Sequence, residues 1–134
     1  MIKIFDLKEQ YKQFGKVIDK KVLNLLSTGN YILGDNVALF EEKTKKYLNG
    51  KYTLSCNSGT DALVLSLRSL GIQKGDEVIT TPFSYFATAE SISLVGAKPV
   101  FADINPHTFN INPKHIANVI TKKTKAILSV NLFG

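Results

Sequence analysis

Two short segments of this 134-residue chain combine residue types that could bind an anion and a flat ring. The first, residues 58–61, is Ser58-Gly59-Thr60-Asp61, and it lies between an expected strand and an expected helix. The free amides of a helix's first turn, with Ser and Thr hydroxyls, form a cradle for an anion, and Gly59 permits unusual backbone angles. Ser and Thr are also favoured helix caps, so capping alone is the alternative. The 58–61 turn matches neither the P-loop nor the dinucleotide-binding fingerprint.

The second segment, residues 80–88, follows an expected strand and is rich in aromatic residues: Phe83, Tyr85 and Phe86. At the carboxyl end of a strand, such side chains could form a stacking platform for a flat ring. Phe83 and Phe86 are expected to pack in the core instead, as aromatic residues commonly do. Tyr85, at the mouth of the following helix, is therefore the best candidate for stacking.

Four other reactive residues give weaker signals. His107 and His115 are eight positions apart across a proline, which is not a metal-ligand spacing, so we expect surface positions and no metal site. Cys56, in an apolar stretch, is expected to be a buried small side chain. Asp103 ends an expected strand, where its carboxylate could serve a site or cap the following loop; both interpretations remain open.

The spacing of apolar residues indicates which elements must position these segments. A helical period over residues 7–26 predicts a first helix, with Asp6 as N-cap, Gly29 beyond its end and Gly15 weakening its continuity. A second helix is expected to carry Val37, Phe40 and Tyr47 and to stop at Asn49-Gly50. Strands are then expected at 51–56, 77–80, 99–102 and 124–130, and helices at 60–70, 85–95 and 113–120. This order predicts an α/β fold with a mostly parallel sheet and helices on both faces, organised as residues 1–50 and 51–134.

Composition and charge exclude several classes of protein. The chain is 44% apolar with 9 Gly and 4 Pro, which excludes a disordered or collagen-like chain. One cysteine cannot form an internal disulfide, no apolar run is long enough to span a membrane, and residues 1–6 do not resemble a signal peptide, so the cytoplasm is expected. The net charge of +6 includes a stripe of lysines on the first expected helix: Lys8, Lys12, Lys16 and Lys20. A solvated helix face is favoured over phosphate-backbone binding, because Arg68 is the only arginine available to read bases.

Several motifs, in order along nearly the whole chain, resemble the sugar-nucleotide aminotransferases of the DegT/StrS type. They include Ser58-Gly59-Thr60-Asp61-Ala62-Leu63, Gly75-Asp76-Glu77-Val78-Ile79, Thr81-Pro82-Phe83-Ser84-Tyr85-Phe86-Ala87-Thr88, Gly96-Ala97-Lys98-Pro99-Val100-Phe101 and the pair Phe40-Glu41. The resemblance implies a pyridoxal-phosphate enzyme of the aspartate aminotransferase fold, of which this chain is the N-terminal part of the large domain. It implies transfer of an amino group, usually from glutamate, to a nucleotide-linked keto-sugar for polysaccharide or glycan synthesis.

The resemblance also assigns residues and partners. Thr60 and the Asp61 amide would grip the cofactor phosphate within the 58–61 turn, and Tyr85 would stack on the pyridine ring. The lysine that forms a Schiff base with the cofactor and the acidic partner of the pyridine nitrogen are expected beyond Gly134, so the chain resembles a truncated enzyme, inactive alone. A homodimer is expected for the full-length family. The alternative is a non-catalytic remnant or binding module.

Overall fold

The computed structural model describes residues 5–134 and divides the chain into two compact units, Met1–Ser55 and Cys56–Gly134. Each unit is described by itself. The expectation that residues 1–6 are not a signal peptide concerns mostly residues 1–4, which lie outside the described part.

The first unit consists of two helices, α1 (Leu7–Thr28) and α2 (Asp35–Tyr47). The predicted caps of α1 are confirmed: the Asp6 carboxylate accepts a hydrogen bond from the Glu9 N–H at 3.2 Å, and Gly29 follows the helix in the left-handed conformation. The Asp6 carboxylate thereby satisfies an N–H that the start of the helix would otherwise leave unpaired, and the left-handed Gly29 ends the helix.

Helix α1 continues through Gly15, although the sequence indicated a weakness there. The Tyr11 ring lies over this glycine, where an added Cβ would come within 2.9 Å of ring atoms. The Tyr11 hydroxyl reaches further along the helix and donates to the Asp19 carboxylate at 2.8 Å. Gly15 therefore provides space for the ring, and the helix tolerates its low propensity.

The first unit has little core of its own. Among described residues 5–55, only Gly15 and Gly34 are buried, and the apolar face of α1 is largely exposed: Leu7, Tyr11, Phe14, Ile18 and Val22. The lysine stripe is also exposed, as expected of a solvated face, and Lys12 pairs with Glu9 at 2.8 Å. Within residues 5–134, no helix is both long and apolar enough to cross a membrane.

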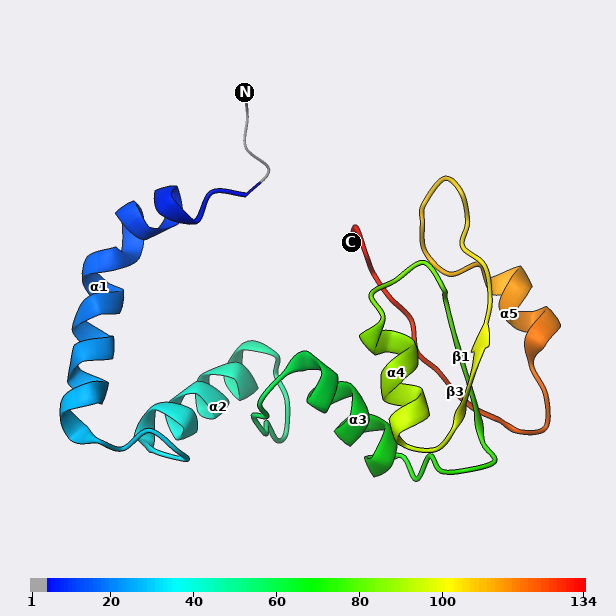
Figure 1. Ribbon diagram of the computed structural model, residues 1–134, viewed down its shortest axis with the longest axis horizontal. Coiled ribbons are helices and arrows are strands. Elements are labelled where there is room, and N and C mark those ends of the chain that lie inside the picture. The colour runs from blue at the N-terminus through cyan, green and yellow to red at the C-terminus, as the bar shows by residue number, and fades with distance from the viewer. Residues whose placement is uncertain (1–4) are drawn as a thin grey trace. The chain divides into compact units, whose positions relative to one another are not determined.

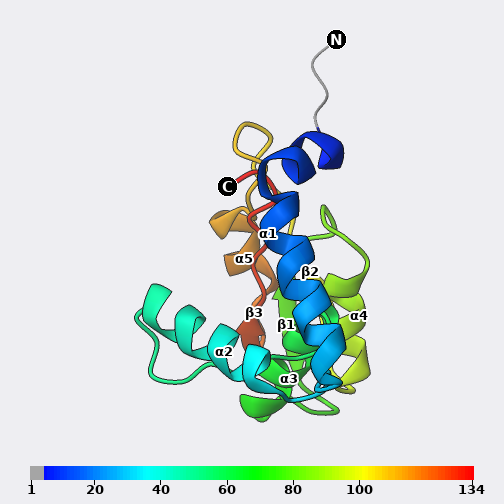
Figure 2. The same cartoon turned by 90° about the vertical axis from the view of Figure 1, so that its left-hand side faces the viewer.

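The second unit is an α/β structure built on a parallel three-stranded sheet. Its elements are α3 (Gly59–Ser69), β1 (Glu77–Thr80), α4 (Ala87–Leu94), β2 (Lys98–Phe101), α5 (Pro113–Val119) and β3 (Thr124–Ile127). The strand order is β2-β1-β3, and Figures 1 and 2 show α4 and α5 on opposite sides of the sheet. The predicted α/β fold with a mostly parallel sheet is confirmed.

The core of this unit forms where α3 and α4 pack beside the central strand. Leu67 of α3, Val78 of β1 and Ile92 of α4 belong to one buried cluster, and Val78 and Ile92 have no exposed surface. Burial of a side chain of this size contributes roughly 1.5–3 kcal/mol. The cluster fixes α3 and α4 against the sheet, and the two candidate segments lead into the first turns of these helices.

Two expectations about residues 51–56 are wrong: the strand and the burial of Cys56. Residues 51–56 form no strand, because within the described chain no other strand pairs with them. Tyr52 and Leu54 are consequently 83% and 82% exposed. Cys56 is exposed rather than buried for the same reason.

Candidate functional site

The 58–61 turn forms the N-terminus of α3, with Ser58 as its N-cap. The Ser58 Oγ accepts a hydrogen bond from the Asp61 N–H at 3.1 Å and donates to Oδ2 of Asp61 at 2.9 Å. The Ser58 carbonyl accepts from the Ala62 N–H at 3.0 Å. Ser58 therefore acts as a helix cap in this structure, and its hydroxyl is fully engaged.

The amides at the first two helical positions are free. Within residues 5–134, neither the Gly59 N–H nor the Thr60 N–H has a hydrogen-bond acceptor. Thr60 is half-buried, and its hydroxyl likewise has no partner among the described residues. Two N–H donors and a hydroxyl at the positive end of a helix form the kind of cradle that binds a phosphate group.

From its sequence, Gly59 is expected to adopt an unusual backbone angle, but the structure shows a different role. It does not adopt a positive φ, so it is not present for an unusual backbone angle. A Cβ added to Gly59 would meet no atom within 4 Å. The glycine therefore leaves the helix start open, which an approaching anion requires.

The Asp61 amide, assigned to the phosphate by resemblance, is occupied by Ser58 in this structure. The Asp61 carboxylate is also held by the Ser58 hydroxyl, which places it in the cap. The donors left for an anion are thus those of Gly59 and Thr60.

The aromatic residues of the 80–88 segment differ in their surroundings. Phe83 stacks on Phe109, with ring centroids 5.9 Å apart, but it is 42% exposed and does not lie in the core as expected. Phe86 is 74% exposed, so its expected place in the core is wrong; it lies at the cap of α4, where no layer covers it. Tyr85 is 80% exposed and makes no ring contact with any described residue.

The structure leaves the Tyr85 ring free for a ligand. The segment begins at Thr80, the last residue of β1, which pairs with Phe101, the last residue of β2. Tyr85 therefore follows the carboxyl edge of the sheet, where open α/β sheets bind ligands. No hydrogen bond or ring contact joins Tyr85 to the 58–61 turn within the described residues.

These groups fit the two ends of pyridoxal phosphate. The phosphate is a dianion that requires N–H and hydroxyl donors, which Gly59 and Thr60 supply. The ring is a flat aromatic that requires an uncommitted platform, which Tyr85 supplies. The open space in front of Gly59 is the structural observation that favours this fit.

The weaker candidates lie outside this arrangement. His107 and His115 are both exposed, as predicted, and residues 5–134 contain no metal-binding group of His, Cys, Asp or Glu. Asp103 is exposed, and its Oδ1 accepts from the Ile104 N–H at 2.8 Å, which favours the loop-capping interpretation.

One anchoring pair in the first unit escaped the sequence interpretation. Oε1 of Glu41, on α2, accepts hydrogen bonds from the Ser55 N–H at 2.8 Å and the Ser55 hydroxyl at 2.7 Å. These bonds, the backbone one foremost, lower the pKa of Glu41. The two residues are 14 positions apart, so no local pattern relates them; the Phe40-Glu41 motif was the only signal.

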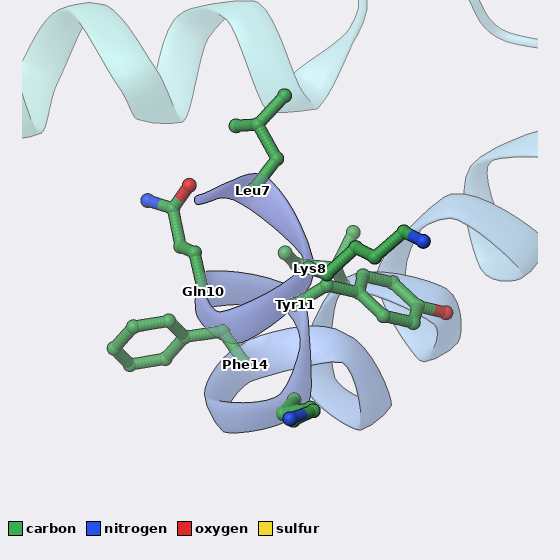
Figure 3. A pocket seen from close by; sticks show the side chains of 7 residues that line it. Leu7, Lys8, Gln10, Tyr11 and Phe14 are labelled. Atoms are coloured by element: carbon green, nitrogen blue, oxygen red, sulfur yellow. The ribbon is translucent and has the colours of Figure 1, made fainter. Parts of the chain in front are cut away.

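A groove on α1 includes none of the predicted site residues. It is lined by Leu7, Lys8, Gln10, Tyr11, Lys12, Phe14 and Ile18. In Figure 3, the side chains of Leu7, Tyr11 and Phe14 point in different directions from the helix. The groove is an open part of the exposed apolar face and has no set of converging polar groups that would orient a small ligand.

Sequence comparison relates the chain to sugar aminotransferases. Residues 12–134 match the DegT/DnrJ/EryC1/StrS aminotransferase family. The chain is 45% identical, over its whole length, to UDP-2-acetamido-2-deoxy-3-oxo-D-glucuronate aminotransferase of Pseudomonas aeruginosa, and covers 37% of that protein. It is 40% identical, again over its whole length, to dTDP-3-amino-3,6-dideoxy-alpha-D-galactopyranose transaminase of Aneurinibacillus thermoaerophilus, and covers 37% of it. The chain thus spans somewhat more than a third of these curated relatives.

Solved structures give the same result. DesV of S. venezuelae superposes with a TM-score of 0.93 at 34% identity, covering 99% of this chain and 36% of that one. NtdA of Bacillus subtilis, solved with bound cofactor PMP, gives a TM-score of 0.87 at 38% identity, covering 91% of this chain and 28% of that one. The fold is therefore that of the corresponding third of PLP-dependent aminotransferases. The chain belongs to the DegT/DnrJ/EryC1/StrS aminotransferase family.

Proposed function

We propose that this chain forms the phosphate- and ring-binding part of a pyridoxal-phosphate-dependent sugar aminotransferase. The observation that carries the proposal is the pair of free amides at Gly59 and Thr60, beside the unpartnered Thr60 hydroxyl at the N-terminus of α3. In this proposal, residues 51–134 are the incomplete cofactor-binding domain, and residues 1–50 are a helical segment that precedes it.

The chain's own residues bind and orient the cofactor. Gly59 and Thr60 donate to the phosphate, Ser58 and Asp61 keep the helix start in shape, and Tyr85 covers one face of the ring. Pyridoxal phosphate supplies the electron sink that lets an amino group move between an amino acid and a keto compound. Because the Thr60 hydroxyl has no partner within the described residues, its O–H bond can rotate to donate to the phosphate.

The substrate class follows from the relatives. Those described above act on sugars linked to UDP or dTDP, which supports a nucleotide-linked keto-sugar as acceptor. Glutamate is the amino donor that the resemblance implies. The product would serve polysaccharide or glycan synthesis in the cytoplasm, and the full-length enzyme would act as a homodimer without nucleic acid or membrane partners.

Residues 1–134 alone are proposed to catalyse no transamination. The reaction needs a lysine amine that reaches the cofactor's aldehyde carbon and moves a proton there. None of the chain's lysines lies in the 58–61 turn or the 80–88 segment. The resemblance implies that the essential lysine lies in the part of the family fold that follows Gly134.

Reduction with borohydride in the presence of pyridoxal phosphate tests this proposal. Mass spectrometry should find only scattered, substoichiometric labelling of lysines, and no amino transfer from glutamate. A stoichiometric adduct on a single lysine, together with amino transfer, would overturn it. The alternative function is a non-catalytic binding module. To distinguish it, the coding DNA is read past codon 134 and the longer chain is expressed. A longer chain that binds the cofactor yet transfers no amino group would favour the alternative.

A further inference from the structure

A buried hydroxyl lies in the first turn of α4, three residues after Tyr85. Thr88, in the first turn of α4, is 7% exposed, and its Oγ1 is 2.6 Å from the Oγ of Ser84. Its carbonyl accepts a hydrogen bond from the Ser91 hydroxyl at 3.0 Å. Its N–H donates to the Tyr85 carbonyl at 3.1 Å. Thr88 is thus bonded to Tyr85 itself and to the residue before it.

Tyr85 has little other support. Within residues 5–134, the bond from Thr88 is its only hydrogen bond, and its ring makes no aromatic contact. On the strand side, the Ser84 N–H donates to the Pro82 carbonyl at 3.0 Å, and the Phe83 N–H donates to Thr81 Oγ1 at 3.1 Å. Among these bonds, the Thr88 contacts are the ones that tie Ser84 and Tyr85 themselves to α4.

We propose that Thr88 is a positioning residue, which holds the backbone at Ser84 and Tyr85 so that the exposed ring is presented to the cofactor. The inference rests on the proposed function, because it assigns Tyr85 to the cofactor ring. Ser91 supports the arrangement from the next turn of α4 by bonding to the Thr88 carbonyl. The hydroxyl is the essential feature, since valine matches threonine in shape but cannot hydrogen-bond to Ser84.

A first measurement examines the chain without ligand. Amide hydrogen exchange at position 88 reports opening of the bond to the Tyr85 carbonyl. Thr88→Val should accelerate this exchange about 3- to 10-fold, as expected for loss of one supporting hydrogen bond. Thr88→Ser should remain near the wild-type rate. Ser93→Ala is the matched control, because the Ser93 hydroxyl bonds to the Ala89 carbonyl on the same helix, away from the segment.

A second measurement asks whether Thr88 acts through the Tyr85 ring. The probe is pyridoxamine phosphate, whose amine cannot condense with surface lysines, and its affinity is measured by titration calorimetry. Thr88→Val should weaken binding about 2- to 5-fold, within the range for a partly lost aromatic stack. In a Tyr85→Leu background, the same substitution should have no further effect, since the two residues act as a unit.

The outcomes separate this inference from the proposed function. Unchanged exchange in Thr88→Val, or equal losses of affinity with and without the Tyr85 ring, would overturn the positioning role and leave the cofactor site standing. Failure of the wild-type chain to bind pyridoxamine phosphate would overturn the proposed cofactor site and this inference with it. Faster exchange together with non-additive affinities would establish Thr88 as the residue that positions Tyr85.

Discussion

Substituting Ser58 and Thr60 separately distinguishes a helix cap from a phosphate site. Ser58 uses both its donor and its acceptor within the chain, by bonding to the amide and carboxylate of Asp61. The Thr60 hydroxyl has no partner in the described chain. Ser58→Ala should therefore lower stability, whereas Thr60→Val should lower affinity for the cofactor.

The magnitudes follow from these contacts. Loss of a serine N-cap costs about 0.5–2 kcal/mol. Thr60→Val removes no internal hydrogen bond and preserves shape, so the stability change should stay within about 0.5 kcal/mol. A hydrogen bond to a charged phosphate is worth roughly 1.5–3 kcal/mol, so the same substitution should weaken binding about 13- to 160-fold.

Urea denaturation followed by circular dichroism measures the first effect, and calorimetric titration with pyridoxamine phosphate measures the second. Ser66→Ala is a suitable control, because its hydroxyl bonds to the Ala62 carbonyl within the body of α3. If Ser58→Ala lowered stability while Thr60→Val kept its affinity for the cofactor, the turn would be a cap only. The assignment of Thr60 to the phosphate would then be wrong.

Three further outcomes test other parts of the structure. Tyr85→Leu should weaken pyridoxamine phosphate binding about 2- to 13-fold, in line with 0.5–1.5 kcal/mol for an aromatic stack, as calorimetry would show. Ile92→Ala should lower the free energy of unfolding by about 2–5 kcal/mol in urea, whereas alanine at exposed Leu70 should cost far less. Hydrogen bonds from Ser55 lower the folded-state pKa of Glu41 below its ordinary 4.5. The pair therefore contributes stability above pH 4.5, and this contribution is lost as the pH falls through the lowered pKa. Glu41→Gln should flatten that part of a curve of unfolding free energy against pH.

Local signals in the sequence were sufficient to predict the bounds of elements whose ends depend on residues within about one turn or a few positions. Asp6 and Gly29 mark the ends of α1 because caps act within one turn. The strand at 77–80 has the predicted bounds, since its apolar residues are followed closely by Pro82. Gly15 wrongly indicated a weak point in α1. The glycine makes room for the Tyr11 ring, and helix propensities do not include such side-chain contacts.

Elements that depend on distant partners could not be predicted in this way. Residues 51–56 have the composition of a strand, but a strand requires a hydrogen-bonded neighbour, and the described chain has none for them. The exposure of Cys56 and Phe86 follows from the same cause, since burial depends on what covers a side chain.

The site was predictable in part. The position of the 58–61 turn before a helix indicated free amides, but only the hydrogen bonds show that they belong to Gly59 and Thr60 and that Ser58 occupies the Asp61 amide. The contact between Ser84 and Thr88 could not be foreseen, because it depends on the path of the chain between β1 and α4.

The most direct test of the central claim is a titration of the isotope-labelled chain with pyridoxamine phosphate, followed by amide NMR. The backbone signals of Gly59 and Thr60 should shift and saturate with a single dissociation constant, and the signals around Tyr85 should shift with the same constant. Inorganic phosphate should move only the first group. If the amides of Gly59 and Thr60 did not respond while scattered lysine-rich segments did, the 58–61 turn would not be the cofactor phosphate site.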